Sequence, residues 1–342
     1  MRTPTSSKAP GAILLRWIVA AAFVAAVVFS GLFAGLLNKA GLLFLLLATA
    51  ASVWMGFSVK EIGAAFRHAA GRPGAPGEIG RSAHLWEAAA RNAWVLGALG
   101  SALNFTGVLS GGSAGIADAS ARMIQSFVIT LYGAVLAVVC LVPAMKLAGP
   151  ARPAPSAGRE AGSSGAGRAP VPWRAAGYAL FAAVLAVTVR ALVAGSPQVG
   201  PLPFARVMLH APAVLVVFGG AVALFLFTGP GTGARGLTLG FAVTGFVALL
   251  AGLIQGLFGF AHSSVQEIAA AGAFIISAAT FALLGLGAVA GPLEDREVME
   301  GRREGPGPLS RLFWVALPLV TFVFLVISFI MVVTPMTKPG AP

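Results

Sequence analysis

Small polar side chains recur at helical spacing within two long apolar stretches of this sequence. Ser101 and Asn104 lie three residues apart in the first stretch, and Ser126, Thr130 and Gly133 follow at four- and three-residue steps in the second. Such spacing places each set on one face of a helix. A hydroxyl group there can bond a carboxylic acid or a water beside it, or it can bond back to a carbonyl of its own helix.

Glycines share these faces. They lie at three- and four-residue steps around Ser101, at positions 97, 100, 107 and 111, and a second set lies around Gln255, at positions 245, 252, 256 and 259. Small residues let helix backbones approach closely within lipid, where packing drives association. Two interpretations stay open: the faces are packing seams, or they line an ion pathway or grip a partner helix.

The composition indicates a membrane environment. The chain has 342 residues, of which 58% are hydrophobic and 10% charged, with a mean hydropathy of +0.89. Soluble domains carry about 25% charged residues, so the sequence is typical of a polytopic membrane protein. The single cysteine, Cys140, excludes an internal disulfide. No His, Cys or carboxylate spacing suggests a metal site, and we expect neither a cofactor nor an enzymatic activity.

The hydropathy pattern predicts an all-α protein with about nine transmembrane helices, because a span needs about 20 apolar residues. The predicted spans lie near residues 12–36, 41–59, 93–111, 121–145, 174–194, 207–228, 237–260, 267–290 and 312–333. The first is too long for a signal-peptide core and is interpreted as a retained span.

Basic residues predict the orientation of these spans. With the N-terminus inside and nine alternating spans, about 18 Lys and Arg residues face the cytoplasm and about five lie outside. The net charge of +12 is therefore a topology signal rather than a nucleic-acid-binding surface. We expect a multi-pass protein of the inner (cytoplasmic) membrane, with the N-terminus cytoplasmic and the C-terminus outside.

A segment rich in Gly, Pro, Ser and Ala divides the chain. It predicts a first four-helix block at residues 1–148, a flexible cytoplasmic linker at 149–172 and a second four-helix block at 173–296. Residues 297–342 add a cytoplasmic connector and a ninth helix. Both blocks contain a glycine-rich span, a short outer turn and a span that ends at a proline before charges, which suggests a parallel tandem repeat. Matching Pro292 to Pro143 places Ala279 at the position of Thr130.

Residues 129–147, "ITLYGAVLAVVCLVPAMKL", resemble the last transmembrane helix of the MotA/TolQ/ExbB proton-channel family. Thr130, Gly133, Pro143 and Lys146 match the threonine, glycine, proline and basic exit of that helix. The preceding span opens with "GALGSAL", similar to the family's Gly-x-x-Gly-Thr pattern, with Ser101 in place of the threonine. Residues 56–69 and 210–230 resemble the exit and the entry of the second helix in the family.

The resemblance implies an A-subunit of an ion-driven stator or energy-transducing complex. Such a subunit acts with a single-span partner that carries an intramembrane Asp, and it forms homo- or hetero-oligomers in the membrane. The residues expected to line the ion pathway or to face the partner helix are Ser101, Asn104, Ser126, Thr130, Gly133 and Pro143.

The acidic residues of this chain fit that expectation, because each is predicted to lie in a loop or at a span end. The mixed charges of residues 292–311 predict a cytoplasmic connector. The absence of an intramembrane acid argues against a self-contained proton pump. It equally fits the alternative, a non-conducting membrane scaffold or a small-solute transporter.

Overall fold

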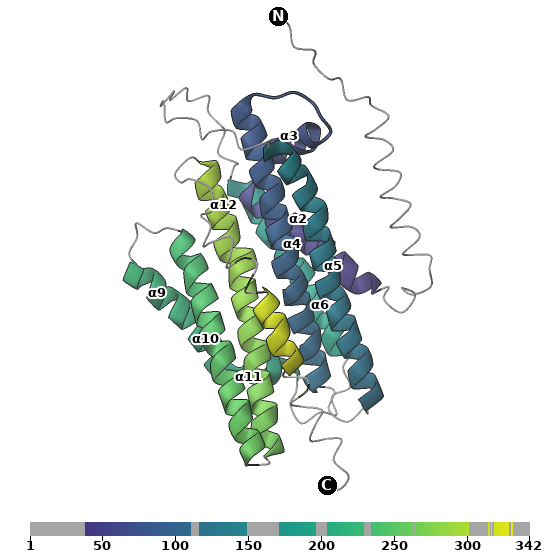
Figure 1. The fold of residues 1–342 in the computed structure, drawn as a ribbon, viewed down its shortest axis with the longest axis vertical. Coiled ribbons are helices and arrows are strands. Elements are labelled where there is room, and N and C mark those ends of the chain that lie inside the picture. Colours follow the sequence, from purple (N-terminus) through teal and green to yellow (C-terminus); the bar gives the residue numbers. More distant parts are fainter. Residues whose placement is uncertain are drawn as a thin grey trace, which may run out of the picture. The chain divides into compact units, whose positions relative to one another are not determined.

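The computed structural model describes residues 38–110, 116–148, 171–195, 204–228, 234–262 and 264–300, and parts of 314–330. Residues 40–342 form one compact unit, which holds nearly all of the described residues. The described residues are mostly helical and contain no strand, which confirms the all-α prediction (Figure 1). The predicted first span, 12–36, and residues 149–170 of the predicted linker lie outside the described part.

In chain order, the described helices are α2 (Lys39–Gly56), α3 (Val59–Ala69), α4 (Pro76–Ser110), α5 (Ile116–Ala148), α6 (Val171–Gly195), α7 (Phe204–Met208), α8 (Ala211–Val214), the π-helical turn η2 (Leu215–Gly219), α9 (Gly220–Thr228), α10 (Ala234–Ala261), α11 (Val265–Leu284), the π-helical turn η4 (Gly285–Ala290) and α12 (Gly291–Met299).

Five of the described helices contain segments long and apolar enough to cross a membrane, so the chain is a multi-pass membrane protein. These segments are Lys39–Gly56, Ile124–Leu147, Arg174–Leu192, Ala234–Gly259 and Gln266–Met299. Each coincides with a predicted span. The predicted span 207–228 instead contains a shorter apolar helix, Ala211–Leu226. Pro212 stands in the first turn of α8, where its missing N–H costs nothing. The count of nine spans and the two-block arrangement stay predictions.

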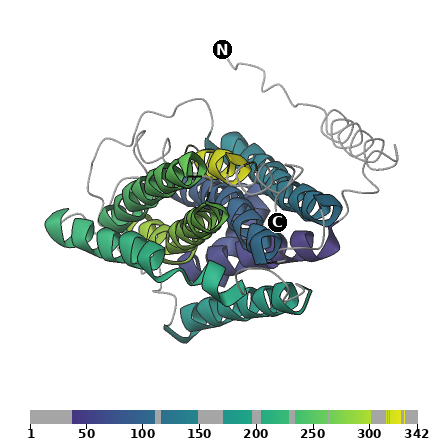
Figure 2. The same cartoon turned by 90° about the horizontal axis from the view of Figure 1, so that it is seen from below.

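Helix α4 lies at the centre of this helical unit. It contacts α5 along one side and α11 along another, and Figure 2, which looks along the helices, shows it between them. The core contains fully buried Leu96 and Leu99 of α4 together with Leu45 of α2 and Leu283 of α11. Helix α6 is the most peripheral of the five apolar segments, with 17% of its apolar window buried against 83% for Gln266–Met299.

Residues 60–92, which separate the predicted spans 41–59 and 93–111, are largely helical and not a loop. They form α3 and the first turns of α4, which is a helix of 35 residues. A capping box starts α3: the Ser58 side chain accepts from the backbone N–H of Glu61, and the Glu61 carboxylate accepts from the backbone N–H of Ser58. The two helices pack together through a buried hydrogen bond of 2.8 Å between His68 Nδ1 and Ser82 Oγ. The polar composition of this stretch concealed its helical pattern.

The connector predicted at residues 292–311 also begins as a helix. Helix α11, η4 and α12 run on without a break from Val265 to Met299. Pro292 lies in the first turn of α12, directly after the π-helical turn. A π turn widens the helix locally, so the helix can continue past the proline. Proline followed by charges therefore did not mark the end of this helix.

Candidate functional site

The backbones of α4 and α5 are in direct contact where two glycines meet. A Cβ atom added to Gly97 would lie 2.8 Å from the Cα of Gly133, and one added to Gly133 would lie 2.8 Å from the Cα of Gly97. Real side chains do not tolerate so short a distance to backbone. The sequence therefore needs glycine at both positions for the two helices to approach this closely.

The hydroxyl groups next to this contact bond to one another inside the hairpin. Ser101 Oγ lies 2.5 Å from the carbonyl oxygen of Ser126 and 2.5 Å from Thr130 Oγ1. Because Ser101 has one hydroxyl proton and donates it to the carbonyl, the Thr130 hydroxyl must donate to Ser101 Oγ. All three residues are buried, with at most 7% of their surface exposed. The hydroxyl network is thus closed between α4 and α5.

The structure brings four of the six predicted site residues together: Ser101, Ser126, Thr130 and Gly133. Asn104 is buried about one turn beyond Ser101 on α4. Pro143 stands inside α5, about 15 Å along the helix from Gly133 at 1.5 Å per residue. Near it, Lys146 Nζ donates a hydrogen bond of 3.0 Å to the carbonyl of Ala69. Ser126, Thr130 and Gly133 therefore share one face of α5, and α4 covers this face.

The opposite face of α5 is apolar and uncovered by the described residues. Its exposed side chains include Ile124, Leu131, Val135, Val138, Val139, Leu141, Val142 and Met145. An apolar surface of this length in a membrane helix meets either lipid or another apolar helix. It is the surface on which α5 can receive a partner.

The hairpin of α10 and α11 closes in a related way but with different residues. A Cβ atom on Gly245 would lie 2.6 Å from Ala282 Cβ, and one on Gly252 would lie 2.4 Å from Ile275 Cγ1. If the Gly97–Gly133 contact is matched to the Gly245–Ala282 contact, three buried apolar residues stand where the first hairpin has hydroxyls. Leu249 takes the place of Ser101, Ile275 that of Ser126 and Ala279 that of Thr130, and each has 0% of its surface exposed.

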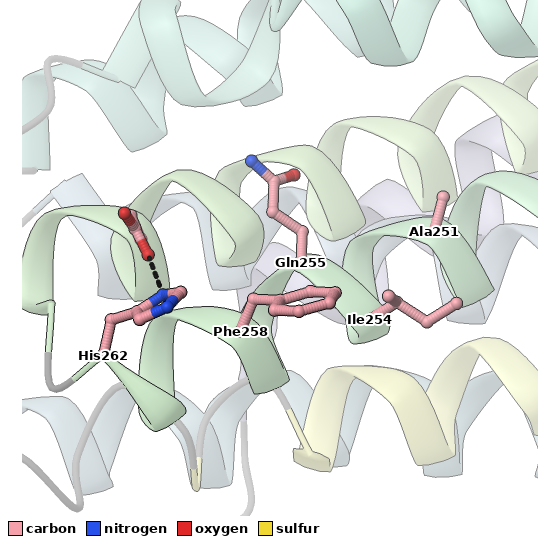
Figure 3. A pocket seen from close by; sticks show the side chains of 6 residues that line it. Ala251, Ile254, Gln255, Phe258 and His262 are labelled. Carbon is pink, nitrogen blue, oxygen red and sulfur yellow. Dashed lines mark ion pairs between the residues drawn. The ribbon is translucent and has the colours of Figure 1, made fainter.

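The amide side chains of the two hairpins, which the sequence pairs as equivalents, lie in different surroundings. Asn104 is buried, whereas Gln255 is exposed on α10 and lines an open surface groove of about 620 Å³ with Ile254 and Phe258 (Figure 3). At the rim of this groove, His262 Nδ1 lies 3.6 Å from Glu267 Oε2, with the two side chains 67% and 52% exposed. This exposed pair contributes little to stability.

Helix α12 carries the residues that the sequence missed. The acidic side chains of α12 and of the residue after it reach three other helices. Asp295 pairs with Arg91 and His84 of α4. The Glu294 carboxylate accepts a hydrogen bond of 3.0 Å from the Thr238 hydroxyl of α10, and the Glu297 carboxylate accepts one of 2.9 Å from the first backbone N–H of α10. The carboxylate of Glu300, just after α12, lies 3.9 Å from the Arg174 guanidinium of α6. These side chains connect α4, α6 and α10 to the segment of α12 and Glu300, which we call the α12 junction.

Asp295 is the most deeply buried acid of the α12 junction. Only 1% of its side chain is exposed, and Oδ2 accepts from Arg91 Nη2 at 2.5 Å. The Arg91 guanidinium also lies over the ring of Trp314, 4.3 Å from its centroid. Glu294 and Asp295 do not lie in a loop of the predicted connector, because both are buried within a helix. The signal in the sequence was the seven-residue spacing of His84 and Arg91, which places both side chains on one face of a helix, two turns apart.

The described residues hold no group of three or more His, Cys, Asp or Glu side chains that could bind a metal ion. Comparisons with protein-family models, with curated proteins and with solved structures gave no match.

Proposed function

We propose that this chain is an A-subunit-like component of an ion-driven membrane complex, either a stator or an energy transducer. It acts with a single-span partner whose membrane helix carries an aspartate. Proton or sodium flow past that aspartate drives a movement of the partner against α4 and α5. Each charge that crosses the membrane releases about 2.3 kcal/mol per 100 mV, which is enough to change the packing of helices.

The observation that carries this proposal is the difference between the two hairpins. The hairpin of α10 and α11 closes with Leu249, Ile275 and Ala279 at the places where the first hairpin has hydroxyls, and these residues are fully buried. Hydroxyl groups are therefore not required to close a hairpin of this kind. Ser101 and Thr130 introduce polarity at a place where packing alone does not need it, and polar groups within spans are commonly functional.

A partner helix has a place to dock beside this seam. The outer face of α5 is apolar over most of its length, and Thr130 lies one residue from exposed Leu131. Neighbouring residues on a helix are about 100° apart, so a rotation of α5 of about this size would be needed to bring the Thr130 hydroxyl from Ser101 to the position of Leu131. There it could bond a carboxylic acid on a helix packed against that face. Pro143 removes one backbone hydrogen bond near the end of α5, which makes this end of the helix easier to bend.

The alternative is a non-conducting scaffold or a small-solute transporter. One observation favours the scaffold: Thr130 and Ser101 satisfy each other inside the closed hairpin, at 2.5 Å, as residues of a packing seam would. An inert scaffold needs no partner with an acid in its span. The two proposals therefore differ in what the chain binds.

Purification from native membranes separates them. We expect the full chain, extracted in mild detergent through an affinity tag, to retain a single-span protein in a fixed ratio. That protein should carry an aspartate within its span, and replacing this aspartate by asparagine should abolish ion-coupled activity without loss of the complex. A chain that purifies alone, or only with partners that lack an intramembrane acid, would contradict the proposal.

A further inference from the structure

Asp295 brings a negative charge into the interior of the helical unit, and its two oxygens have different surroundings. Oδ2 is held by Arg91, whose guanidinium is itself fixed against Trp314. Oδ1 points to the imidazole ring of His84, with 3.3 Å between Oδ1 and Nε2. The close approach of Gly56, where an added Cβ would lie 3.3 Å from Asp295 Cβ, leaves the carboxylate little room to turn.

The two atoms that face each other have no other partner. Among the described residues, neither Asp295 Oδ1 nor His84 Nε2 makes a hydrogen bond, although both atoms are fully buried. A buried polar atom without a partner is costly, and a proton on Nε2 that points to Oδ1 would satisfy both at once. When one imidazole nitrogen donates to a carboxylate, the other nitrogen is left to take up or release a proton.

The geometry points to His84 and Asp295 as a proton-binding site within this chain, at the contact between α4 and α12. Asp295 holds the neutral ring with its proton on Nε2. A hydronium ion then transfers a proton to Nδ1: one O–H bond breaks, one N–H bond forms, a water molecule is left and the imidazole becomes imidazolium. With Asp295 and Arg91 both charged, this step changes the net charge of the three side chains from zero to plus one.

The surroundings allow this exchange with water. The His84 side chain is 12% exposed, and exposed Glu78 and Arg81 lie within two turns of it on α4. Besides Asp295 of α12, the His84 ring faces Phe57, which follows α2, with 5.9 Å between ring centroids. No described charged side chain other than Arg91 and His84 lies within ion-pair distance of Asp295.

This site goes beyond the function proposed above, which assigns the ion-carrying acid to the partner. His84 lies about 25 Å along α4 from Ser101, at 1.5 Å per residue, so the proton site and the hydroxyl seam are separate. Proton binding at His84 changes the charge at the contact that joins α4 to α12. The site can therefore be examined in the purified chain without any partner.

Nuclear magnetic resonance of the full chain in lipid nanodiscs, with ¹⁵N-labelled histidine, tests the proposal directly. The protein has four histidines, so the His84 signals can be assigned by their loss in His84→Gln. We expect neutral His84 to carry its proton on Nε2 and to gain its second proton at Nδ1 when the pH is lowered. A neutral ring protonated on Nδ1, or a ring that gains no second proton, would overturn the proposal.

Two further variants distinguish a specific pair from a general pH response. In Asp295→Asn the negative charge is gone, so the doubly protonated form of His84 should appear only at lower pH than in the wild-type chain. Glu267→Gln is the matched control, because it removes the acid beside exposed His262 and should leave the His84 signals unchanged. If Asp295→Asn does not fold, the protonation pattern of the His84 ring in the wild-type chain still tests the proposal. An unchanged His84 titration in a folded Asp295→Asn variant would count against the pair.

Discussion

The two long hairpins of this protein are closed by different means. Between α4 and α5, two glycines bring the backbones together, and hydroxyl groups bond across the contact beside them. Between α10 and α11, glycines receive the side chains of Ala282 and Ile275, and the positions matched to the hydroxyls are apolar Leu249, Ile275 and Ala279. Glycine thus supplies the close approach in both hairpins. Buried hydroxyls of α10 and α11, such as Thr244 and Ser277, bond other elements instead of bonding across this contact.

The hairpins also differ in how they are attached to the rest of the helical unit. The outer face of α5 is exposed over most of its length, whereas α11 is surrounded and continues into the α12 junction. Buried charges on α12 fix the end of the second hairpin to α4. The second hairpin is thus suited to hold the structure together, and the first retains a free surface and polar groups.

The largest effect on stability is expected at the α12 junction. Asp295→Asn leaves Arg91 buried without its counter-charge, and breaking a buried ion pair in this way costs about 3–5 kcal/mol. Glu267→Gln, which breaks the exposed pair with His262, should cost less than about 1 kcal/mol. Unfolding of both variants in detergent, followed by helical circular dichroism, measures the difference. Equal losses would show that the Asp295 pair does not hold the hairpins together.

The next largest effect should come from the glycine contact of the first hairpin. In Gly97→Ala the new methyl group meets the backbone of Gly133, which cannot move aside as a side chain can. We expect a loss of about 2–3 kcal/mol from overpacking, measured by the same unfolding experiment. Gly63→Ala on α3 is the control, because nothing lies within 4 Å of its Cβ position. A Gly97→Ala variant as stable as Gly63→Ala would place α4 and α5 farther apart than described.

A smaller effect is expected when the polar residue of the first hairpin is introduced into the second. Ala279→Thr adds a hydroxyl and a methyl group at a position with no exposed surface. The hydroxyl can bond back to a carbonyl of α11, so the cost should be about 1 kcal/mol, mainly from crowding. Thermal unfolding checks this value. A variant that gains stability would mean that this seam is not as closely packed as the contacts indicate.

Periodicity and hydropathy predicted the parts of the fold that depend on long apolar faces. The predicted spans at 41–59, 121–145, 174–194, 237–260 and 267–290 coincide with segments apolar enough to cross a membrane. Periodicity also placed Ser126, Thr130 and Gly133 on one face. It did not predict that Thr130 bonds Ser101, because that contact depends on the register of α4 against α5.

The remaining differences have a common physical cause. Residues 60–92 and the first turns after Pro292 are rich in charges, which local rules assign to loops. In the structure several of these charged residues lie on helices and contact other helices. Arg91 and His84 pair with Asp295, and Glu297 accepts from the first backbone N–H of α10. Pairing between residues about 200 positions apart cannot be read from a local pattern. The predicted boundaries of the two blocks and of the linker remain predictions.

The most direct test of the account concerns Thr130 itself. Thr130→Val keeps the shape of the side chain but removes the hydroxyl that bonds Ser101, and the stability cost should be small, about 0.6 kcal/mol. Thr106→Val is the matched control, because the buried Thr106 hydroxyl bonds the carbonyl of Ala102 on its own helix. The measurement is proton or sodium flux through the complex, purified with its partner and reconstituted in liposomes under an imposed membrane potential. The account predicts that Thr130→Val assembles normally and loses most of the flux while Thr106→Val retains it. Full flux in a well-assembled Thr130→Val complex would show that the hydroxyl network only packs α4 against α5, and it would contradict the proposed function.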